Sequence, residues 1–396
     1  MKVLLTTPGT PGFLFPTIGI ARALVAKGHE VAFATSQTAG DLLRSAGLER
    51  IPRTEKDGHS FEIFNWFHPT AIGLQLKHIH YATKHFGPDL LLGHPLTMGT
   101  YLAAELLDLP LAVIGSPNFL WPVAGDRDPE SIRRRKWRWR DFLKYYNLAR
   151  QALGIDRVDV SQGNPFLGDL YLMRSLAEVE PEAAHFPEKV KLVGDCLWEP
   201  PETSRAVGRL LREAEETGRE LWFVQVGRSF QRTSYFHSLV AIAERRHWLL
   251  VLCRDRMDLD LDGLPENMRV FDHLPLGQLA PRLGGMIAVG GPTAVLSGWR
   301  HGVPMLIIPG GSEQWDSADH VVDAGVGTSL VPEEVTPDLL LRTVEELAAD
   351  EGIRRRCGEV SQVFRAFDGH RCVADHLENW ADERLGIGQM GYSGVK

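Results

Sequence analysis

The feature that most limits how this chain can fold is an alternation of short apolar runs and helical segments, which occurs twice. At the start, the run Lys2–Thr7 is followed by a loop (residues 8–16), by helical spacing at Thr17–Lys27 and by a second run at Glu30–Thr35. Short runs that are apolar throughout are typical of strands buried on both faces of a parallel sheet. This order predicts a strand–helix–strand unit and an α/β fold class.

The same alternation returns in the second half of the chain. Further strands are predicted at Leu221–Val226, Trp248–Cys253, Met268–Phe271, Met286–Val289 and Met305–Ile308, with helical segments between them. A chain of 396 residues is too long for one ordinary hydrophobic core. Two α/β series of similar size favour two sheets that face each other across a cleft. The segment Trp198–Ser204 (WEPPETS) is the best candidate for the linker.

Two stretches interrupt this rhythm. Residues 55–85 are rich in histidine and aromatic residues and show no clear period, which is typical of a binding loop or a lid. Residues 121–175 contain several large aromatic residues, namely Trp121, Trp137, Trp139, Tyr145 and Tyr146. These aromatic residues either surround a cavity or fill the core, and the sequence leaves both interpretations open.

Charge and cysteine content exclude several classes of function. The net charge of −8 gives no extended positive field for a nucleic-acid backbone. The one basic cluster, RRRKWRWR at residues 133–140, either contacts an anionic partner or forms a solvated helix face. The four cysteines are scattered without the spacing of a zinc site, so we expect free thiols, a reducing cytoplasm and no metal.

Segments that direct a protein into a membrane are not expected either. The N-terminus, MKVLLTTPG, lacks the length and the charged lead-in of a signal peptide. No stretch reaches the roughly 18 apolar residues that a membrane-spanning helix needs. We therefore expect a cytoplasmic protein that is not an integral membrane protein, with a glycine-rich, disordered tail from Gly386 onward. A homodimer is compatible with the sequence.

The strongest local signal for a binding site is the turn Gly290–Gly291. A predicted strand ends at Val289, and a helix begins near Pro292–Thr293. Bare glycine backbone at a helix N-terminus lets an anion approach closely, and the helix dipole attracts a phosphate group. Turns of this kind also occur with nothing bound, so the prediction depends on what lies beside the turn.

The next strand places a second polar loop beside this turn. After the predicted strand Met305–Ile308, the loop PGGSEQWD carries Glu313, Gln314 and Asp316. The carboxyl ends of neighbouring parallel strands lie at the same edge of a sheet, so the two loops should adjoin. The side-chain oxygens can hold the hydroxyl groups of a sugar. The alternative role for the acidic residues is to cap the following helix.

These stretches resemble the natural-product and macrolide branch of the inverting GT-B glycosyltransferases. That family usually shows H-G-G-A-G-T after a strand, then R-x-G-V-P, then P-x-x-x-D-Q-x-x-N/D-A. Here the corresponding stretches read VGGPTA from Val289, RHGVP from Arg300 and PGGSEQWDSA from Pro309. The opening TTPGTPGFLFPTIGIARALVAKGHEV, GPDLLLGHP and FVQVGRS match as well, so the resemblance extends over almost the whole chain.

The resemblance implies two facing Rossmann-like domains with an interdomain cleft, and neither a cofactor nor a metal. We expect residues 1–200 to form the acceptor-binding domain and residues 201–375 the domain that binds a nucleoside-diphosphate sugar. Residues 376–396 are expected to form a helix that crosses back to the first domain, and a flexible tail. The donor sugar should be linked to UDP or dTDP as a co-substrate, and the acceptor should be a small hydrophobic molecule.

The resemblance also implies roles for individual residues. The donor diphosphate is expected to bind at Gly227, Arg228, Ser229, Gly290, Gly291 and Thr293. The nucleotide base is expected near His273 and Leu274, whose stretch DHLPLGQLAPRLGG is similar to the one that faces the base in the family. Glu313 and Gln314 are expected to bind the sugar, and the acceptor pocket is expected to include Phe13, Trp66 and His68.

Two positions depart from the family pattern. Where the family has a histidine that deprotonates the acceptor, this chain has Phe13, and loss of a general base costs about a hundredfold to ten-thousandfold in rate. Where the family has a histidine that donates to the diphosphate, this chain has Val289. In a rebuilt site, Arg228 would neutralise the leaving group and His94 would be the base. The histidines of residues 55–85 are further candidates for the base.

Other hypotheses change the function itself. A chain without both histidines could be a catalytically silent scaffold or an activator of another glycosyltransferase. Nucleotide-sugar 2-epimerisation is a third option, for which we find no suitable set of acid and base residues. We favour transfer of a hexose or deoxyhexose from a nucleoside-diphosphate sugar to a hydrophobic or aromatic natural-product acceptor, with inversion.

Overall fold

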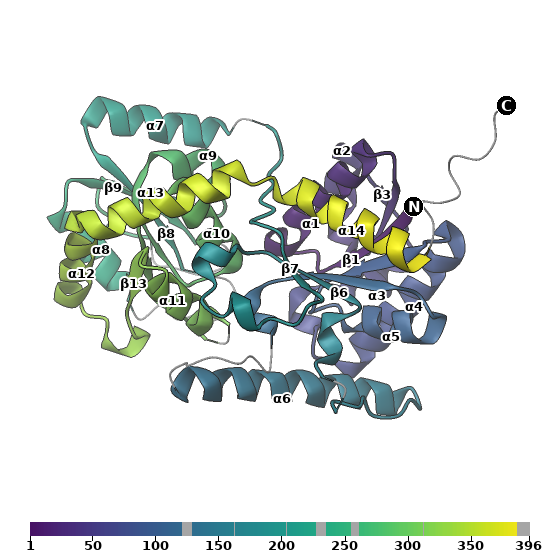
Figure 1. Cartoon of the computed structure of the whole chain (residues 1–396). Coiled ribbons are helices and arrows are strands. Elements are labelled where there is room, and N and C mark those ends of the chain that lie inside the picture. The colour runs from purple at the N-terminus through teal and green to yellow at the C-terminus, as the bar shows by residue number, and fades with distance from the viewer. Residues whose placement is uncertain are drawn as a thin grey trace. The chain divides into compact units, whose positions relative to one another are not determined.

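The computed structural model divides the chain into two compact units (Figure 1). It describes residues 1–120, 129–161, 163–202, 204–226, 235–254, 261–311 and 313–385. The N-terminal unit comprises Met1–Ser175, Ala184–Trp198 and the chain from Asp368 onward, and the C-terminal unit comprises Leu176–Ala183 and Glu199–Phe367. Gly227, Arg228, Ser229, Trp121 and the tail from Gly386 lie outside the described residues.

A seven-stranded sheet with parallel pairing forms the centre of the N-terminal unit, in the order β3-β2-β1-β4-β5-β6-β7. Its strands are β1 (Lys2–Thr7), β2 (Glu30–Thr35), β3 (Glu49–Arg50), β4 (Leu90–Gly93), β5 (Leu111–Gly115), β6 (Leu170–Met173) and β7 (Val190–Leu192). The chain winds from β1 to one edge and then, from β4, to the other. The carboxyl ends of β1 and β4 therefore flank the crevice where α/β sheets bind ligands.

Helices cover both faces of this sheet, as parallel strands require. They are α1 (Pro11–Ala26), α2 (Gly40–Ser45), α3 (Glu55–His59), α4 (Pro69–Phe86), α5 (Met98–Leu107), α6 (Pro129–Ala152) and α14 (Gly369–Leu385). One face packs against α1 and α14 through residues such as Ile18 and Leu377. The other face packs against α4, α5 and α6 through residues such as Ile72 and Phe142.

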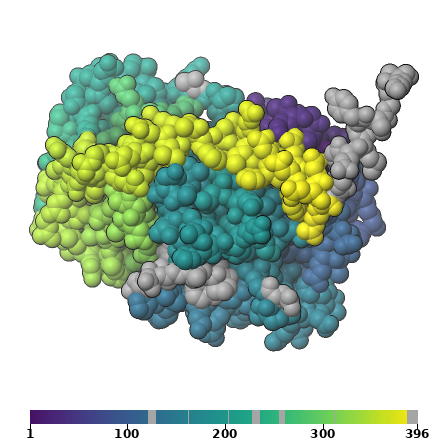
Figure 2. Space-filling model, viewed as in Figure 1, coloured from purple at the N-terminus to yellow at the C-terminus, as the bar shows by residue number. Residues whose placement is uncertain are grey.

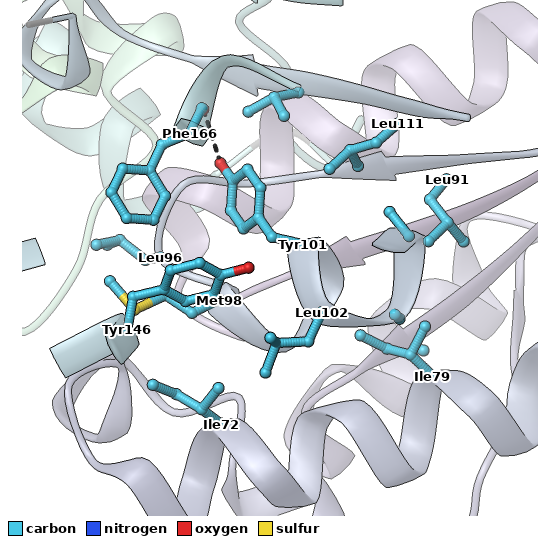
Figure 3. Packing of buried hydrophobic residues seen from close by; sticks show 14 of the residues in the cluster. Ile72, Ile79, Leu91, Leu96, Met98, Tyr101, Leu102, Leu111, Tyr146 and Phe166 are labelled. Atoms are coloured by element: carbon cyan, nitrogen blue, oxygen red, sulfur yellow. Dashed lines mark hydrogen bonds between the residues drawn. The ribbon is translucent and has the colours of Figure 1, made fainter. Parts of the chain in front are cut away.

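Aromatic side chains hold α6 onto this second face (Figure 3). The Tyr101 ring from α5 contacts Tyr146 of α6 and Phe166, with ring centroids 6.3 and 5.5 Å away. The Tyr101 hydroxyl donates a hydrogen bond of 3.0 Å to the carbonyl oxygen of Phe166, so this buried polar group has a partner. Burial raises the pKa of Tyr101, which keeps the hydroxyl a donor at neutral pH.

The last helix, α14, packs on α1 within the N-terminal unit. Gly19 makes the close approach possible, because a Cβ at Gly19 would lie 2.1 Å from Nε2 of His370. At the end of α1, Lys27 forms ion pairs with Asp375 and Glu378 of α14. Figure 2 shows α14 (yellow, at the C-terminal end of the colour scale) exposed along one side at the molecular surface.

The C-terminal unit contains a six-stranded parallel sheet in the order β10-β9-β8-β11-β12-β13. Its strands are β8 (Glu220–Gln225), β9 (Trp248–Cys253), β10 (Met268–Phe271), β11 (Leu283–Ala288), β12 (Met305–Ile307) and β13 (Gly327–Ser329). Its helices are α7 (Arg205–Thr217), α8 (Phe236–Arg245), α9 (Leu276–Leu279), α10 (Pro292–His301), α11 (Gln314–Asp323), α12 (Pro337–Ala349) and α13 (Glu351–Ala366). Here the winding reverses between β8 and β11, which makes their carboxyl ends the expected ligand crevice of this sheet.

Two predicted loops turned out to be helical. Helix α1 begins at Pro11, so Phe13 lies in its first turn and not in a loop, because proline fixes a helical φ at the first helical position. Residues 55–85 form α3, a 3₁₀ turn at Ile63–Asn65 and α4, so this segment is not an irregular insertion. Its helical period was hidden because polar residues point inward: Gln75 donates to the carbonyl oxygen of Ser60, and His78 bonds that of Ile51.

Among the described residues, no helix is both long enough and apolar enough to span a bilayer. All four cysteines are free thiols.

Candidate functional site

The turn Gly290–Gly291 begins two residues after the end of β11, at the reversal point of the C-terminal sheet. Gly290 has φ of 88°, a conformation that side chains with a Cβ rarely adopt. A Cβ there would also lie 3.0 Å from the carbonyl oxygen of Gln314 and 3.1 Å from Cγ2 of Ile307. Glycine at position 290 is therefore required both by the backbone and by the close approach of the next loop.

Gly291 is the N-cap of α10, and Pro292 occupies the first helical position. The amides of Ala294 and Val295 donate to the carbonyl oxygen of Gly291 at 3.0 and 3.2 Å. Pro292 has no N–H, so the attraction of this turn for an anion depends on the glycine backbone and on the dipole of a ten-residue helix. Thr293, predicted to bind the diphosphate, is half-buried in the first turn.

The second polar loop lies beside this turn, as predicted, because β11 and β12 are paired neighbours. Gln314 is buried, and its amide oxygen accepts a hydrogen bond of 2.8 Å from the backbone N of Gly310. The amide oxygen of Gln314 therefore stabilises the conformation of this loop. Glu313 is half-buried and its side chain does not cap α11, so the capping alternative is wrong for this residue.

Gln225 is a polar residue at this edge to which the sequence analysis gave no role. It is the last residue of β8 and pairs with Ala288 of β11. A Cβ built on Gly291 would lie 3.9 Å from Oε1 of Gln225, so the amide faces the glycine turn across the reversal point. The sequence did contain a signal for this role, because Gln225 is a polar residue at the carboxyl end of the apolar run of β8, where ligands of parallel sheets bind.

His273 and Leu274 follow β10, the edge strand, two strands away from β8. Leu274 is buried and packs inside the unit, whereas His273 is exposed. The segment continues into α9, where the backbone N of Gly277 donates to Glu199 at 3.0 Å. Of the two residues predicted to face a nucleotide base, only His273 has a side chain exposed enough to contact one.

In the N-terminal unit, the structure brings Phe13 and His94 together at the reversal point of the sheet. Phe13 follows β1 and His94 follows β4, and their ring centroids are 4.5 Å apart. Phe119 adds a third ring, 5.9 Å from His94 in an edge-on arrangement. The position that holds a histidine in the family thus packs directly on the histidine that we predicted as its replacement.

The surroundings of His94 define what its ring can do. The side chain is buried, and Nδ1 accepts a hydrogen bond of 3.2 Å from the backbone N of Leu96. Burial, with a contribution from the nearby Arg174 guanidinium, lowers the pKa of His94 to about 3. The neutral ring then carries its proton on Nε2, where it is a hydrogen-bond donor. A role as general base requires that the Leu96 bond be broken first.

We expect His94→Ala to lower kcat by at least about tenfold while the affinity for nucleotide stays unchanged. Because the pKa of His94 is about 3, we also expect the acid limb of the kcat/KM profile to show no step near pH 6.5. Steady-state kinetics across pH, with calorimetry on both proteins, check this. A step near pH 6.5 that disappears in His94→Gln, or normal turnover in His94→Ala, would contradict the prediction.

The predicted acceptor residues divide into two groups. Phe13 and Trp66 both pack against the hydrophobic cluster of the second face, and the Trp66 ring stacks on Phe142 of α6 with centroids 4.7 Å apart. His68, in contrast, is an exposed residue that precedes α4 and does not belong to this cluster. The structure therefore places Phe13 and Trp66 in one apolar region and leaves His68 outside it.

A small pocket lies against this region. It is lined by Asn118, Phe119, Leu120, Arg135, Arg138, Trp139, Phe142 and Phe166. Phe119 connects it to the Phe13–His94 pair, since the Phe119 ring also contacts Phe142. The aromatic residues of 121–175 therefore serve several purposes: Trp139 lines the pocket, Tyr146 fills the core and Trp137 is exposed to solvent.

Within the part of the chain that the structure describes, no three histidine, cysteine or carboxylate side chains gather as metal ligands would.

Comparison with known proteins identifies relatives over nearly the full length of the chain. Residues 238–375 match the family described as "Erythromycin biosynthesis protein CIII-like, C-terminal domain". The demethyllactenocin mycarosyltransferase of Streptomyces fradiae is 26% identical over 402 aligned positions, which cover 93% of this chain and 84% of the relative.

Solved structures agree in fold. The glycosyltransferase of kitacinnamycin superposes with a TM-score of 0.76 at 21% identity, over 96% of this chain and 98% of that chain. The glycosyltransferase VinC, solved with dTDP, superposes with a TM-score of 0.69 at 18% identity, over 97% of this chain and 100% of that chain. The chain therefore has the GT-B fold of these structures, and its residues 238–375 match the EryCIII-like C-terminal domain.

Proposed function

We propose that this protein transfers a hexose or deoxyhexose from a nucleoside-diphosphate sugar to a hydrophobic or aromatic natural-product acceptor, with inversion at the anomeric carbon. The observation that carries the proposal is the turn Gly290–Gly291, where a left-handed glycine leads into the N-terminus of α10 at the reversal point of a parallel sheet. This combination is an anion site by its backbone alone. The named relatives that match nearly the whole chain support the same activity.

The donor site is assigned to the C-terminal unit. The diphosphate would lie against Gly290, Gly291 and Thr293, with Gln225 beside it. The sequence adds Gly227, Arg228 and Ser229, which lie outside the described residues, as further predicted phosphate contacts. The sugar would lie against Glu313 and the amide nitrogen of Gln314. UDP and dTDP both fit the proposal, and the complex of VinC with dTDP favours testing dTDP first.

The acceptor site is assigned to the N-terminal unit, around Phe13, Trp66 and the pocket edge at Phe119. The oxygen of the acceptor would attack the anomeric carbon from the side opposite the diphosphate. The new carbon–oxygen bond forms as the bond to the diphosphate breaks, and the acceptor loses its proton. Because Phe13 cannot take this proton, we assign the proton transfer to His94, or to an acceptor acidic enough to ionise by itself, with the histidines of residues 55–85 as further candidates.

The proposal can be tested with a pair of matched carboxamide variants. We expect calorimetry to detect binding of dTDP or UDP to the wild type, and we expect Glu313→Gln to keep this affinity but to abolish slow hydrolysis of the corresponding nucleoside-diphosphate sugar. The control is Glu216→Gln, which removes an exposed carboxylate in the last turn of α7, before the amino end of β8 and so at the opposite edge of the sheet, and should change neither quantity.

Each outcome separates the proposal from its alternative. Lack of nucleotide binding by the wild type would overturn the proposal and favour a silent scaffold or an activator of another glycosyltransferase. Binding and hydrolysis that survive unchanged in Glu313→Gln would refute the assigned role of Glu313 in the sugar site. We further propose a cytoplasmic enzyme, in line with its four free thiols. A homodimer stays a prediction, which the mass of the protein in solution checks.

A further inference from the structure

Helix α6 concentrates positive charge in a chain that is negative overall. It carries eight basic and two acidic residues, whereas the whole chain has a net charge of −8. Three of the basic side chains are used internally: Arg135 and Arg138 are buried at the pocket, and Arg150 pairs with Glu105. The remaining charge lies on the side of the helix that faces away from the core.

The outward side of α6 has a regular composition. The residues Ile132, Lys136, Arg140, Lys144 and Leu148 are four positions apart and all exposed. Each step of four residues turns by about 40°, so these residues form one stripe that winds over about 160° of the outer side of the helix and is about 24 Å long. We call this stripe, together with its neighbour Trp137, the basic stripe. Figure 1 shows α6 at the edge of its unit.

Trp137 is the most unusual member of the basic stripe. Its side chain is 61% exposed, although burying an indole in the core would be strongly favourable. No hydrogen bond or ion pair is found for Lys136 or Arg140 among the described residues, whereas Arg133 on the neighbouring turn is neutralised by Glu130. The stripe thus presents a tryptophan and unneutralised cations together, flanked at both ends by an exposed aliphatic residue.

We propose that the basic stripe of α6 docks the protein reversibly onto an anionic lipid surface. The cations would attract the phosphate headgroups, and Trp137 would insert its ring at the headgroup level, where tryptophan is enriched. Lysine at two of the three cationic positions favours lipid over a protein partner, because lysine is depleted from protein interfaces. A convex helix also offers no groove for a partner, since the pocket beside α6 is lined by its opposite face.

This docking is independent of the proposed transferase activity, but it has a consequence for substrates. Hydrophobic acceptors partition into bilayers, so a protein bound at the surface meets them at a raised local concentration. Docking depends on screened charges, so it should weaken as salt is added. Membrane attachment of this kind needs no membrane-spanning helix.

The test is co-sedimentation of the full chain with vesicles. We expect binding to vesicles of phosphatidylcholine mixed with phosphatidylglycerol, and little binding to phosphatidylcholine alone. The variant Lys136→Glu/Arg140→Glu should lower the partition coefficient at least about tenfold. The matched control is Arg205→Glu/Arg209→Glu on α7, which changes the net charge equally at exposed positions elsewhere and should retain binding.

A second measurement reports on the indole itself. Brominated phospholipids should quench part of the tryptophan fluorescence, and Trp137→Phe should remove that quenched part although the chain has ten tryptophans. Absence of sedimentation, equal binding to neutral vesicles, or equal loss in the α7 control would overturn the proposal. Retention on immobilised polyglutamate without vesicle binding would also overturn it and would assign the stripe to an acidic protein.

Discussion

Replacing Gly290 by valine should destabilise the C-terminal unit by about 2–5 kcal/mol and abolish nucleotide binding. The backbone at Gly290 has φ of 88°, which a β-branched residue adopts only with strain. The added Cβ would also press on the carbonyl oxygen of Gln314 at 3.0 Å, which displaces the start of α11. Urea unfolding and calorimetry with dTDP measure the two effects, and Gly290→Ala offers a milder variant if the valine variant does not fold.

The neighbouring glycine provides the matched control. Gly291 has φ of −63°, and a Cβ there would find Gln225 Oε1 as its nearest neighbour at 3.9 Å, so Gly291→Ala should lower stability by no more than about 1 kcal/mol, the usual cost of alanine at an N-cap. The same Cβ would stand between the backbone and an approaching diphosphate, so the alanine variant should still lose affinity. A Gly290→Val protein that is as stable as the wild type would show that contacts with Gln314 and Ile307 do not fix this turn. Full affinity in Gly291→Ala would remove the diphosphate from this turn.

Acidification from pH 7 to pH 4 should destabilise the N-terminal unit by at least about 3 kcal/mol. The pKa of buried His94 is about 3 in the folded protein, below the ordinary value of 6.5. Between these two pH values the unfolded chain binds a proton that the folded chain does not, so stability is lost as the pH falls below 6.5. Burial lowers the pKa values of His78 and His370 as well, which adds to the loss in the same unit.

Hydrogen exchange at several pH values measures this loss of stability separately in the N-terminal and the C-terminal unit. Peptides from β4, α4 and α14 should lose protection as the pH falls. In the C-terminal unit, burial raises the pKa of Glu199, which acts in the opposite direction, so that unit should be less affected. His94→Gln, which cannot be protonated in this range, should flatten the dependence of the N-terminal unit. A dependence that is equally steep in His94→Gln would exclude His94 as its main source.

Much of the fold could be predicted because parallel strands leave a clear local pattern. The strands β1, β2, β9 and β10 lie where the apolar runs placed them. The short strands β3 and β13 were missed, since two or three residues in mixed surroundings have no period to detect. Helix α4 was missed for another reason, because it buries Gln75 and His78 on hydrogen bonds to loop carbonyl groups. A search for apolar residues at helical spacing cannot detect a helix whose inward-pointing residues are polar.

The candidate site was predictable where its chemistry depends on the backbone. A pair of glycines between a strand and a helix already indicates an anion site, because the amides and the dipole do not depend on distant residues. The position of Gln225 beside Gly291 was not predictable, since it depends on β8 pairing with β11, which are far apart in the sequence. The same is true of the basic stripe, because the local sequence allowed a buried Trp137 as well as an exposed one.

By itself, then, the sequence determined the two parallel α/β sheets, the glycine turn after β11 and a phenylalanine at position 13, where the family it resembles has a histidine. Only the tertiary structure decided that Phe13 packs on His94 and that the backbone N–H of Leu96 donates to Nδ1 of His94. It also decided that the His94 ring is buried, with a pKa of about 3. Local pattern fixes which segments are strands, because it reflects burial of each segment. The order of strands in a sheet is fixed by how the crossover helices pack, and that order decides which side chains meet at its carboxyl edge.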